Sequence, residues 1–234
     1  TTGQRGKNMP YGVIVDCGSV LLGGLAGAFL KEHFPERVKT SLPNIFGLSA
    51  IAMGIVLTVK LNSLSAVVLA LILGTVAGEL LRLEDGLQKG LRCLEHHIPS
   101  DLDQKQIDVL ISMIVLFCFS GTGIFGAMNS AMTGDHTVLY AKAIMDFFTA
   151  LIFGTTSGFL VGLIAIPQFA VQMILYSASS YILPFVSDVM LNNFKACGGM
   201  LTLAVGLKIA DIKYMKVLNL VPALILIFPF SILL

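Results

Sequence analysis

The sequence has few charged residues and no tryptophan. Of its 234 residues, 12% are charged and 56% are hydrophobic, with a mean hydropathy of +0.87. A soluble domain is about one quarter charged, so this composition excludes an ordinary soluble domain and indicates an integral membrane protein. The net charge is only +1, which leaves no basic face for nucleic acid.

The sequence also lacks the patterns that hold metals or carry out catalysis. Its four cysteines are scattered without a C-x-x-C pair, and the adjacent His96 and His97 point to different sides of a helix. No nucleophile elbow, phosphate loop or His/Cys/Asp cluster is present. We therefore expect no cofactor, no metal site and no enzymatic activity.

Long apolar runs recur along almost the whole chain, and about 20 residues of helix cross a bilayer core. We expect an all-α, polytopic membrane helix bundle of about eight transmembrane helices, with seven as the alternative if the run from Val138 to Val186 is counted differently. The expected spans are residues 11–31, 44–59 and 64–81, one from about 107, two between 138 and 186 that join at Pro167, then 191–209 and 214–234.

Two features of the first span concern packing and charge. Gly23 and Gly27 form a G-x-x-x-G pattern, which lets a neighbouring helix approach closely. Asp16 lies only about five residues inside the span, and we expect it near the membrane interface, where ionisable groups are less costly.

The chain is expected to have five parts. They are a disordered or artificially added N-terminus (1–10), a first three-helix repeat (11–82), an amphipathic cytoplasmic linker (83–106), a central helix pair with a glycine-rich segment (107–161) and a second three-helix repeat (162–234). With eight spans, one side of the membrane receives ten lysines and arginines and the other four. By the positive-inside rule both termini face away from the cytoplasm, and the linker is cytoplasmic.

The two ends of the chain show a weak internal repeat. Gly47, Ala52 and Gly54 match Gly199, Ala204 and Gly206 at a constant offset of 152, and the sequence ALIL recurs one inserted residue later. Spans one to three then correspond to spans six to eight. A displacement of five spans reverses direction across the membrane, so we expect an inverted repeat, an arrangement that recurs in secondary transporters.

The polar residues that are unusual in an apolar chain gather between Phe117 and Gly154. Polar groups without partners cost several kcal/mol in lipid, so we interpret this stretch as the functional site. The candidate substrate-binding residues are Ser120, Gly121, Thr122, Gly123, Asn129, Lys142 and Asp146.

Two alternatives are open within this stretch. The fourth span either continues as a glycine-packed helix through Ser120–Gly123, or it unwinds there and exposes backbone groups to a ligand. Asp146 lies deep in the fifth span, one turn from Lys142. It either forms a static ion pair with that lysine or carries a proton or cation during transport.

Several segments of the chain resemble a known family. LPNIFGLSAIAMGI, IVLFCFSGTGIFGAMNSAMTGD, AKAIMDFFTALIFG and GLKIADIKYMKVLNLVPALIL are similar to the YqgA/YdfK-like bacterial inner-membrane proteins, a domain-of-unknown-function family. The resemblance implies a multispanning protein of the bacterial inner membrane and suggests transport, without assigning binding residues.

Taken together, we expect a secondary transporter of an ion or small molecule that works as a homodimer in the lipid bilayer. An ion channel and a non-transporting scaffold or regulatory subunit are the alternatives. A broken fourth span that lines a polar cavity would favour transport, a continuous wet pore a channel, and a dry, uninterrupted bundle a scaffold.

Overall fold

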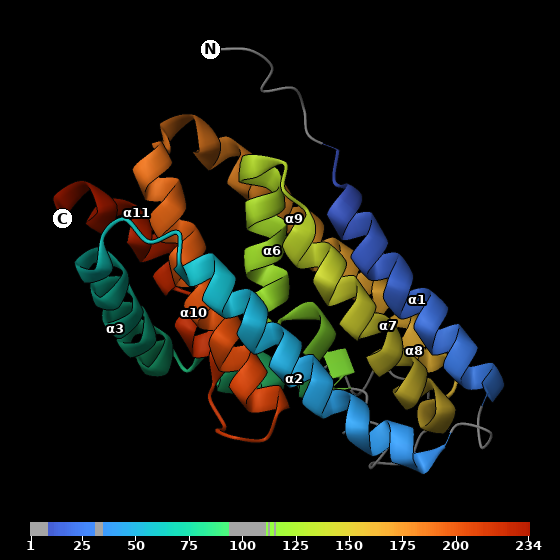
Figure 1. Cartoon of the computed structure of the whole chain (residues 1–234). Coiled ribbons are helices and arrows are strands. Elements are labelled where there is room, and N and C mark those ends of the chain that lie inside the picture. The colour runs from blue at the N-terminus through green and yellow to red at the C-terminus, as the bar shows by residue number, and fades with distance from the viewer. Residues whose placement is uncertain (1–8, 31–34, 94–110, 112, 115) are drawn as a thin grey trace.

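The structure is a computed structural model and describes residues 9–30, 35–93, 111, 113, 114 and 116–234. Every regular element in these residues is helical (Figure 1), as the predicted all-α class requires. The helices are α1 (Tyr11–Leu30), α2 (Glu36–Thr58), α3 (Leu64–Leu81), α4 (Leu83–Cys93), α6 (Gly121–Thr133), α7 (Thr137–Ser157), α8 (Leu160–Leu163), α9 (Ala165–Ile182), η3 (Leu183–Phe185), α10 (Asp188–Ile209), η4 (Val217–Leu220) and α11 (Ala223–Leu233). The expected N-terminal segment up to residue 8 and the linker from residue 94, with both of its histidines, lie outside the described residues.

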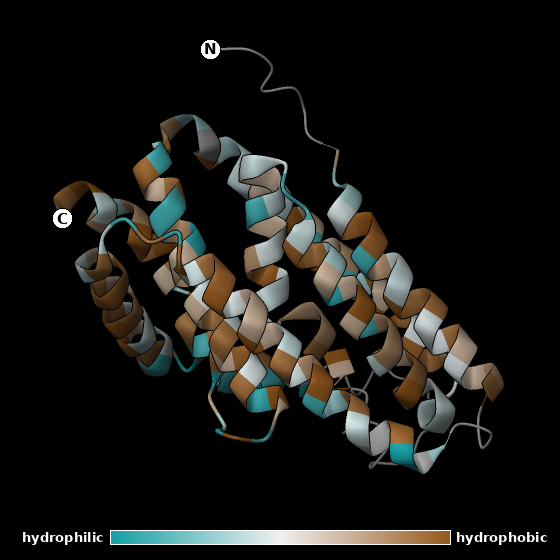
Figure 2. Cartoon of the chain, viewed as in Figure 1, coloured by the Kyte–Doolittle hydropathy of each residue, from teal (hydrophilic) through white to brown (hydrophobic). Residues whose placement is uncertain are grey.

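Five helical segments in the described part of the chain are long and apolar enough to cross a membrane. They are Tyr11–Leu30, Ser41–Thr58, Leu64–Gly90, Thr137–Ser157 and Leu160–Ile182. Their outer faces carry large exposed apolar side chains, such as Phe29 at 88% and Leu80 at 79% exposure, and α3 is apolar along most of its length (Figure 2). Such faces suit contact with lipid, so the protein is a helical membrane protein. Of the other expected spans, α10 is a 22-residue helix and Val217–Leu233 is a shorter apolar helix.

Glycines bring α1 and α7 together, as the G-x-x-x-G pattern predicts. Gly12 lies beside Leu139 and Gly27 beside Gly154, so the two helices run parallel. A Cβ added at Gly27 would lie 2.8 Å from the Cα of Gly154, a distance that only glycine allows without a shift of backbone. The close contact fixes the position of α7, which carries Lys142 and Asp146, against α1.

The helices α2 and α10 cross antiparallel at the matched glycines of the internal repeat. A Cβ at Gly54 would lie 2.7 Å from the carbonyl oxygen of Gly199, and one at Gly206 would lie 2.8 Å from that of Gly47. The contacts of Gly74 with Ala223 and of Gly78 with Asn219 show that α3 also runs antiparallel to the η4–α11 segment. Small residues thus allow the close approach of the two helices in each pair.

The connection between α7 and α9 differs from the prediction. The chain turns at Gly158, whose φ of 68° favours glycine, and continues through the short α8. Pro167, predicted to mark the join, lies inside the first turn of α9. That position tolerates proline because a first-turn N–H has no partner within the helix.

A buried carboxylate holds α4 against the C-terminal segment. Glu84 is 3% exposed and accepts hydrogen bonds from Tyr214 Oη at 3.1 Å and from Leu218 N at 3.3 Å, with Lys208 Nζ at 3.4 Å. Its own backbone N–H donates to Asn219 Oδ1 at 2.9 Å. All four partners belong to the fold of this end of the molecule, so we assign Glu84 a structural role.

Candidate functional site

The fourth expected span is broken. Described residues up to Cys118 are helical, Ser120 has an extended backbone (φ −68°, ψ 140°), and α6 begins at Gly121. The Ser120 hydroxyl accepts a hydrogen bond from Gly123 N at 3.1 Å and so caps α6. Of the two alternatives, the continuous glycine-packed helix is therefore wrong and the interrupted helix is correct.

The break brings the N-terminus of α6 against α7. A Cβ at Gly123 would lie 3.0 Å from Lys142 Cε, and one at Gly121 would lie 2.8 Å from a methyl group of Val217. The two glycines thus leave room for close packing around the start of α6. The first-turn N–H groups of α6, which no helix can satisfy internally, lie at the same place.

Lys142 lies at the centre of a buried ion network. Its ammonium contacts Asp146 one turn along α7, as the i, i+4 spacing predicts, and also lies 3.1 Å from Asp16 Oδ2 on α1. The side chains of Asp16, Lys142 and Asp146 are 0%, 2% and 13% exposed. Asp16, which we expected near the membrane interface, is enclosed within the helix bundle by the close packing of α1 on α7.

Two glutamines of α9 complete this network. Gln168 Nε2 donates to Asp16 Oδ2 at 2.8 Å and to Asp146 Oδ2 at 3.3 Å, and Gln172 Nε2 donates to Asp16 Oδ2 at 2.5 Å. Asp16, Gln168 and Gln172 were not among the site residues predicted from the sequence. The signal that was available is the i, i+4 pair of glutamines within an apolar run, since such amides need partners in a membrane.

The network has too little positive charge and too few donors. With all three groups ionised, the two carboxylates and one ammonium sum to a charge of −1. Asp16 Oδ1 and Gln168 Oε1 are buried and have no hydrogen-bond partner among the described residues. Buried polar atoms are normally hydrogen-bonded, so both oxygens have the capacity to accept a further hydrogen bond.

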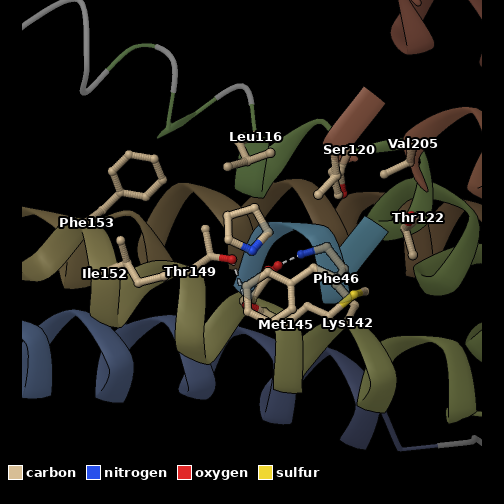
Figure 3. Close-up of a pocket in the computed structure, with 13 residues that line it drawn as sticks. Phe46, Leu116, Ser120, Thr122, Lys142, Met145, Thr149, Ile152, Phe153 and Val205 are labelled. Atoms are coloured by element: carbon tan, nitrogen blue, oxygen red, sulfur yellow. Dashed lines mark hydrogen bonds and ion pairs between the residues drawn. The ribbon is translucent and has the colours of Figure 1, made fainter. Parts of the chain in front are cut away.

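A cavity of about 420 Å³ lies beside this network (Figure 3). Its polar lining comes from the broken span and from α7: Ser120, Thr122, Lys142, Asp146 and Thr149. Its apolar lining comes mainly from α2, α7 and α10: Pro43, Phe46, Leu116, Met145, Ile152, Phe153, Val205 and Ile209. The Thr122 hydroxyl is buried without a hydrogen-bond partner in the described structure. The cavity therefore has one polar wall and an otherwise apolar surface.

The predicted site residues separate into three groups. Ser120, Thr122, Lys142 and Asp146 line the cavity, and Gly121 and Gly123 are packed behind it. Asn129 lies elsewhere, at the far end of α6, where its Nδ2 donates to the carbonyl oxygen of Asp135 at 3.1 Å.

The turn near Asn129 has a structural role. Asp135 Oδ1 accepts a hydrogen bond from Thr137 N at 3.0 Å at the start of α7. Partial burial by itself would raise the pKa of Asp135, but the hydrogen bonds from the hydroxyl and the backbone of Thr137 outweigh it and lower that pKa. The carboxylate thus stabilises the helix start, away from the cavity.

Comparisons with known proteins agree with the resemblance seen in the sequence. Residues 11–232 match the family described as "Protein of unknown function (DUF554)". The chain is 44% identical over 227 residues to "Uncharacterized protein YqgA" of Escherichia coli (strain K12), covering 95% of this chain and 97% of that protein. It is 26% identical over 220 residues to "Uncharacterized membrane protein YdfK" of Bacillus subtilis (strain 168), covering 92% and 93%. No solved structure matches it. The chain is therefore a member of the DUF554 family of helical membrane proteins.

Proposed function

We propose that the protein is a secondary transporter of an ion or small molecule across the bacterial inner membrane. The observation that carries this proposal is the cavity, which lies at a broken helix and reaches a buried ion network. Transporter substrate sites commonly form at discontinuous helices, and ionisable groups within a bilayer mark substrate or proton paths. A scaffold protein would need neither feature.

We also propose eight spans. The five long apolar segments supply five of them. The interrupted helix around Ser120, the 22-residue α10, and η4 together with α11 supply the other three. This assignment places the cavity between four spans, because its walls come from α2, the broken helix, α7 and α10.

The helix directions support an inverted repeat of spans one to three and six to eight. The matched helices α2 and α10 run antiparallel, and so do α3 and the η4–α11 segment. In the third pair, Asp16 lies beside Gln172 of α9 and Gly24 beside Gly162 of α8, so α1 runs antiparallel to the α8–α9 segment too. Opposite directions in all three pairs are what a two-fold axis in the membrane plane requires.

Charge asymmetry supports a cytoplasmic position for the end of the bundle that carries α4. Gln88 is exposed on α4. A Gln88→Cys variant without other accessible thiols should resist a membrane-impermeant maleimide in intact cells and react after the cells are broken. Rapid labelling in intact cells would reverse the orientation. The homodimer stays a prediction, which cross-linking in native membranes can test.

Uptake into proteoliposomes tests the transport function. A pool of ions and small metabolites is first screened for compounds that raise the melting temperature, since a ligand of the folded state stabilises it. We expect the compounds selected in this way to accumulate with saturation kinetics in wild-type vesicles and much less with Asp146→Asn. Equal accumulation in protein-free vesicles would refute transport, and a non-saturating ion current would indicate a channel instead.

A further inference from the structure

The unbalanced charge of the ion network indicates what the cavity binds. We propose that the cavity takes a monovalent organic cation with an apolar body, and that this cation exchanges with one proton held by the network. The inference rests on the proposed transport function and adds the substrate class and the coupling ion. It starts from three buried charges that sum to −1, a state that is costly in lipid unless one positive charge joins them.

Of the two charged groups that line the cavity, the negative one is the more exposed. Asp146 is 13% exposed and Lys142 only 2%. Asp146 Oδ2 accepts from Lys142 and Gln168, whereas Oδ1 accepts no hydrogen bond within the described part of the chain. The Lys142 ammonium is shared between two carboxylates. The carboxylate that lines the cavity thus keeps one oxygen with free lone pairs, which attracts a cation.

The size and lining of the cavity favour an organic ligand over a bare metal ion. A volume of about 420 Å³ lies within the range of small-molecule sites, roughly 300–1,000 Å³. Most of the lining is apolar, including Phe46, Met145 and Phe153. The described residues also contain no group of three or more His, Cys, Asp or Glu side chains that could hold a metal. An apolar body against α2 and α10, with its charge at Asp146, matches both parts of the surface.

A proton can neutralise the net negative charge of the network in place of the cation. The charged groups that face Asp146 are Lys142 on α7 and Asp16 on α1, while α9 contributes two neutral amides. The thiols of Cys17 and Cys118 lie close enough to interact electrostatically with the charges of the network. The cavity walls from α2 and α10 present only apolar side chains. Within the described residues, one proton or one monovalent cation therefore neutralises the network, and binding both would leave it positive.

The exchange balances in charge and atoms. In the proton-loaded form, one carboxyl group of the network carries an O–H bond. When the cation enters, that bond breaks, the proton passes to water and the cation pairs with the Asp146 carboxylate, so the buried charge stays at zero. Mutually exclusive binding of a proton and a cation at one site is the basis of antiport, because each occupant must leave before the other can bind.

Titration with charged and neutral probes of similar size tests the inference. Purified protein in weakly buffered detergent solution is mixed with benzyltrimethylammonium, phenylacetate or benzyl alcohol, and binding and proton release are recorded together. We expect benzyltrimethylammonium to bind with release of about one proton, and its affinity to rise about tenfold per pH unit while the site is protonated. Phenylacetate and benzyl alcohol should bind weakly and release no proton.

Three variants separate the charge argument from simple loss of fold. Asp146→Asn and Asp16→Asn each leave one carboxylate with Lys142, so both networks are neutral without a proton, and both should lose cation binding and proton release. Asp211→Asn, on an exposed residue with φ of 55° that asparagine also tolerates, should behave as wild type.

Three outcomes would overturn the inference. Binding of phenylacetate with proton uptake would show that the site prefers an anion. This result would refute the proposal of a cationic substrate but would leave the proposed transport function standing. Failure of benzyltrimethylammonium to bind, or binding without proton release, would also refute it. The proteoliposome uptake experiment then decides the transport function separately.

Discussion

Replacing Lys142 by methionine should strongly destabilise the protein. Methionine keeps much of the length of the side chain but removes the ammonium that two carboxylates share. Asp16 would retain only amide donors, Gln168 and Gln172, and Asp146 only Gln168. Because both carboxylates are largely buried, solvent cannot compensate for the loss.

The expected magnitude follows from this burial. Breaking a buried ion pair by removal of one partner costs about 3–5 kcal/mol. For a chain of this size that corresponds to a fall in melting temperature of roughly 6–20 °C. The loss should shrink as the pH falls, because protonation of the stranded carboxylates removes the unpaired buried charge. Adding Asp16→Asn and Asp146→Asn to the variant should likewise restore most of the stability.

The chain offers a suitable assay for this comparison. It has no tryptophan, but Cys17, Cys118 and Cys197 are buried free thiols. With Cys93 replaced by serine, a thiol-reactive fluorogenic dye should report unfolding as these three thiols become accessible. The matched control is Lys216→Met, because Lys216 and its partner Asp85 are 36% and 42% exposed, and exposed pairs contribute little. If Lys142→Met melts within about 2 °C of wild type at every pH, the Lys142 ammonium does not stabilise two buried, ionised carboxylates.

Three further predictions concern other parts of the structure. Gly54→Ala should lower the melting temperature, because the new Cβ would lie 2.7 Å from the carbonyl oxygen of Gly199 and force α2 away from α10. The control Gly90→Ala, whose Cβ would have nothing within 4 Å, should be neutral or stabilising. Equal melting temperatures of the two variants would contradict the helix crossing. Ser120→Ala should lower the free energy of unfolding by about 1 kcal/mol, because α6 loses its cap. Thr122→Val should lower it little, because the Thr122 hydroxyl has no described partner. Denaturation in a detergent series can compare the two variants, and equal losses would contradict the role of Ser120 as the cap of α6. The lowered pKa of Asp135 stabilises the fold above the ordinary carboxyl pKa, and this contribution is lost as the pH falls below about 4. In Asp135→Asn the melting temperature should therefore fall less steeply with pH in this acid range. Identical profiles for the variant and the wild type would argue against the hydrogen bond from Thr137 to Asp135.

The sequence by itself determined the class of protein and one part of the site. Composition and the length of the apolar runs required helices in a bilayer, because a spanning segment must satisfy its backbone hydrogen bonds internally. The i, i+4 spacing of Lys142 and Asp146 placed their charges together, since one turn of helix fixes that geometry whatever surrounds it. Local spacing also predicted that Gly27 would meet a neighbouring helix, though not which helix.

Only the tertiary structure decided whether the span breaks at Ser120 and where Asp16 lies. Glycine and serine permit either a close-packed helix or a cap, and the choice depends on what packs around Gly121 and Gly123. Asp16 meets Gln168, which is 152 positions away, because the registers of α1 on α7 and on α9 bring them to one level. Such a long-range register depends on the packing of whole helices, so the position of Asp16 within its own span could not reveal it.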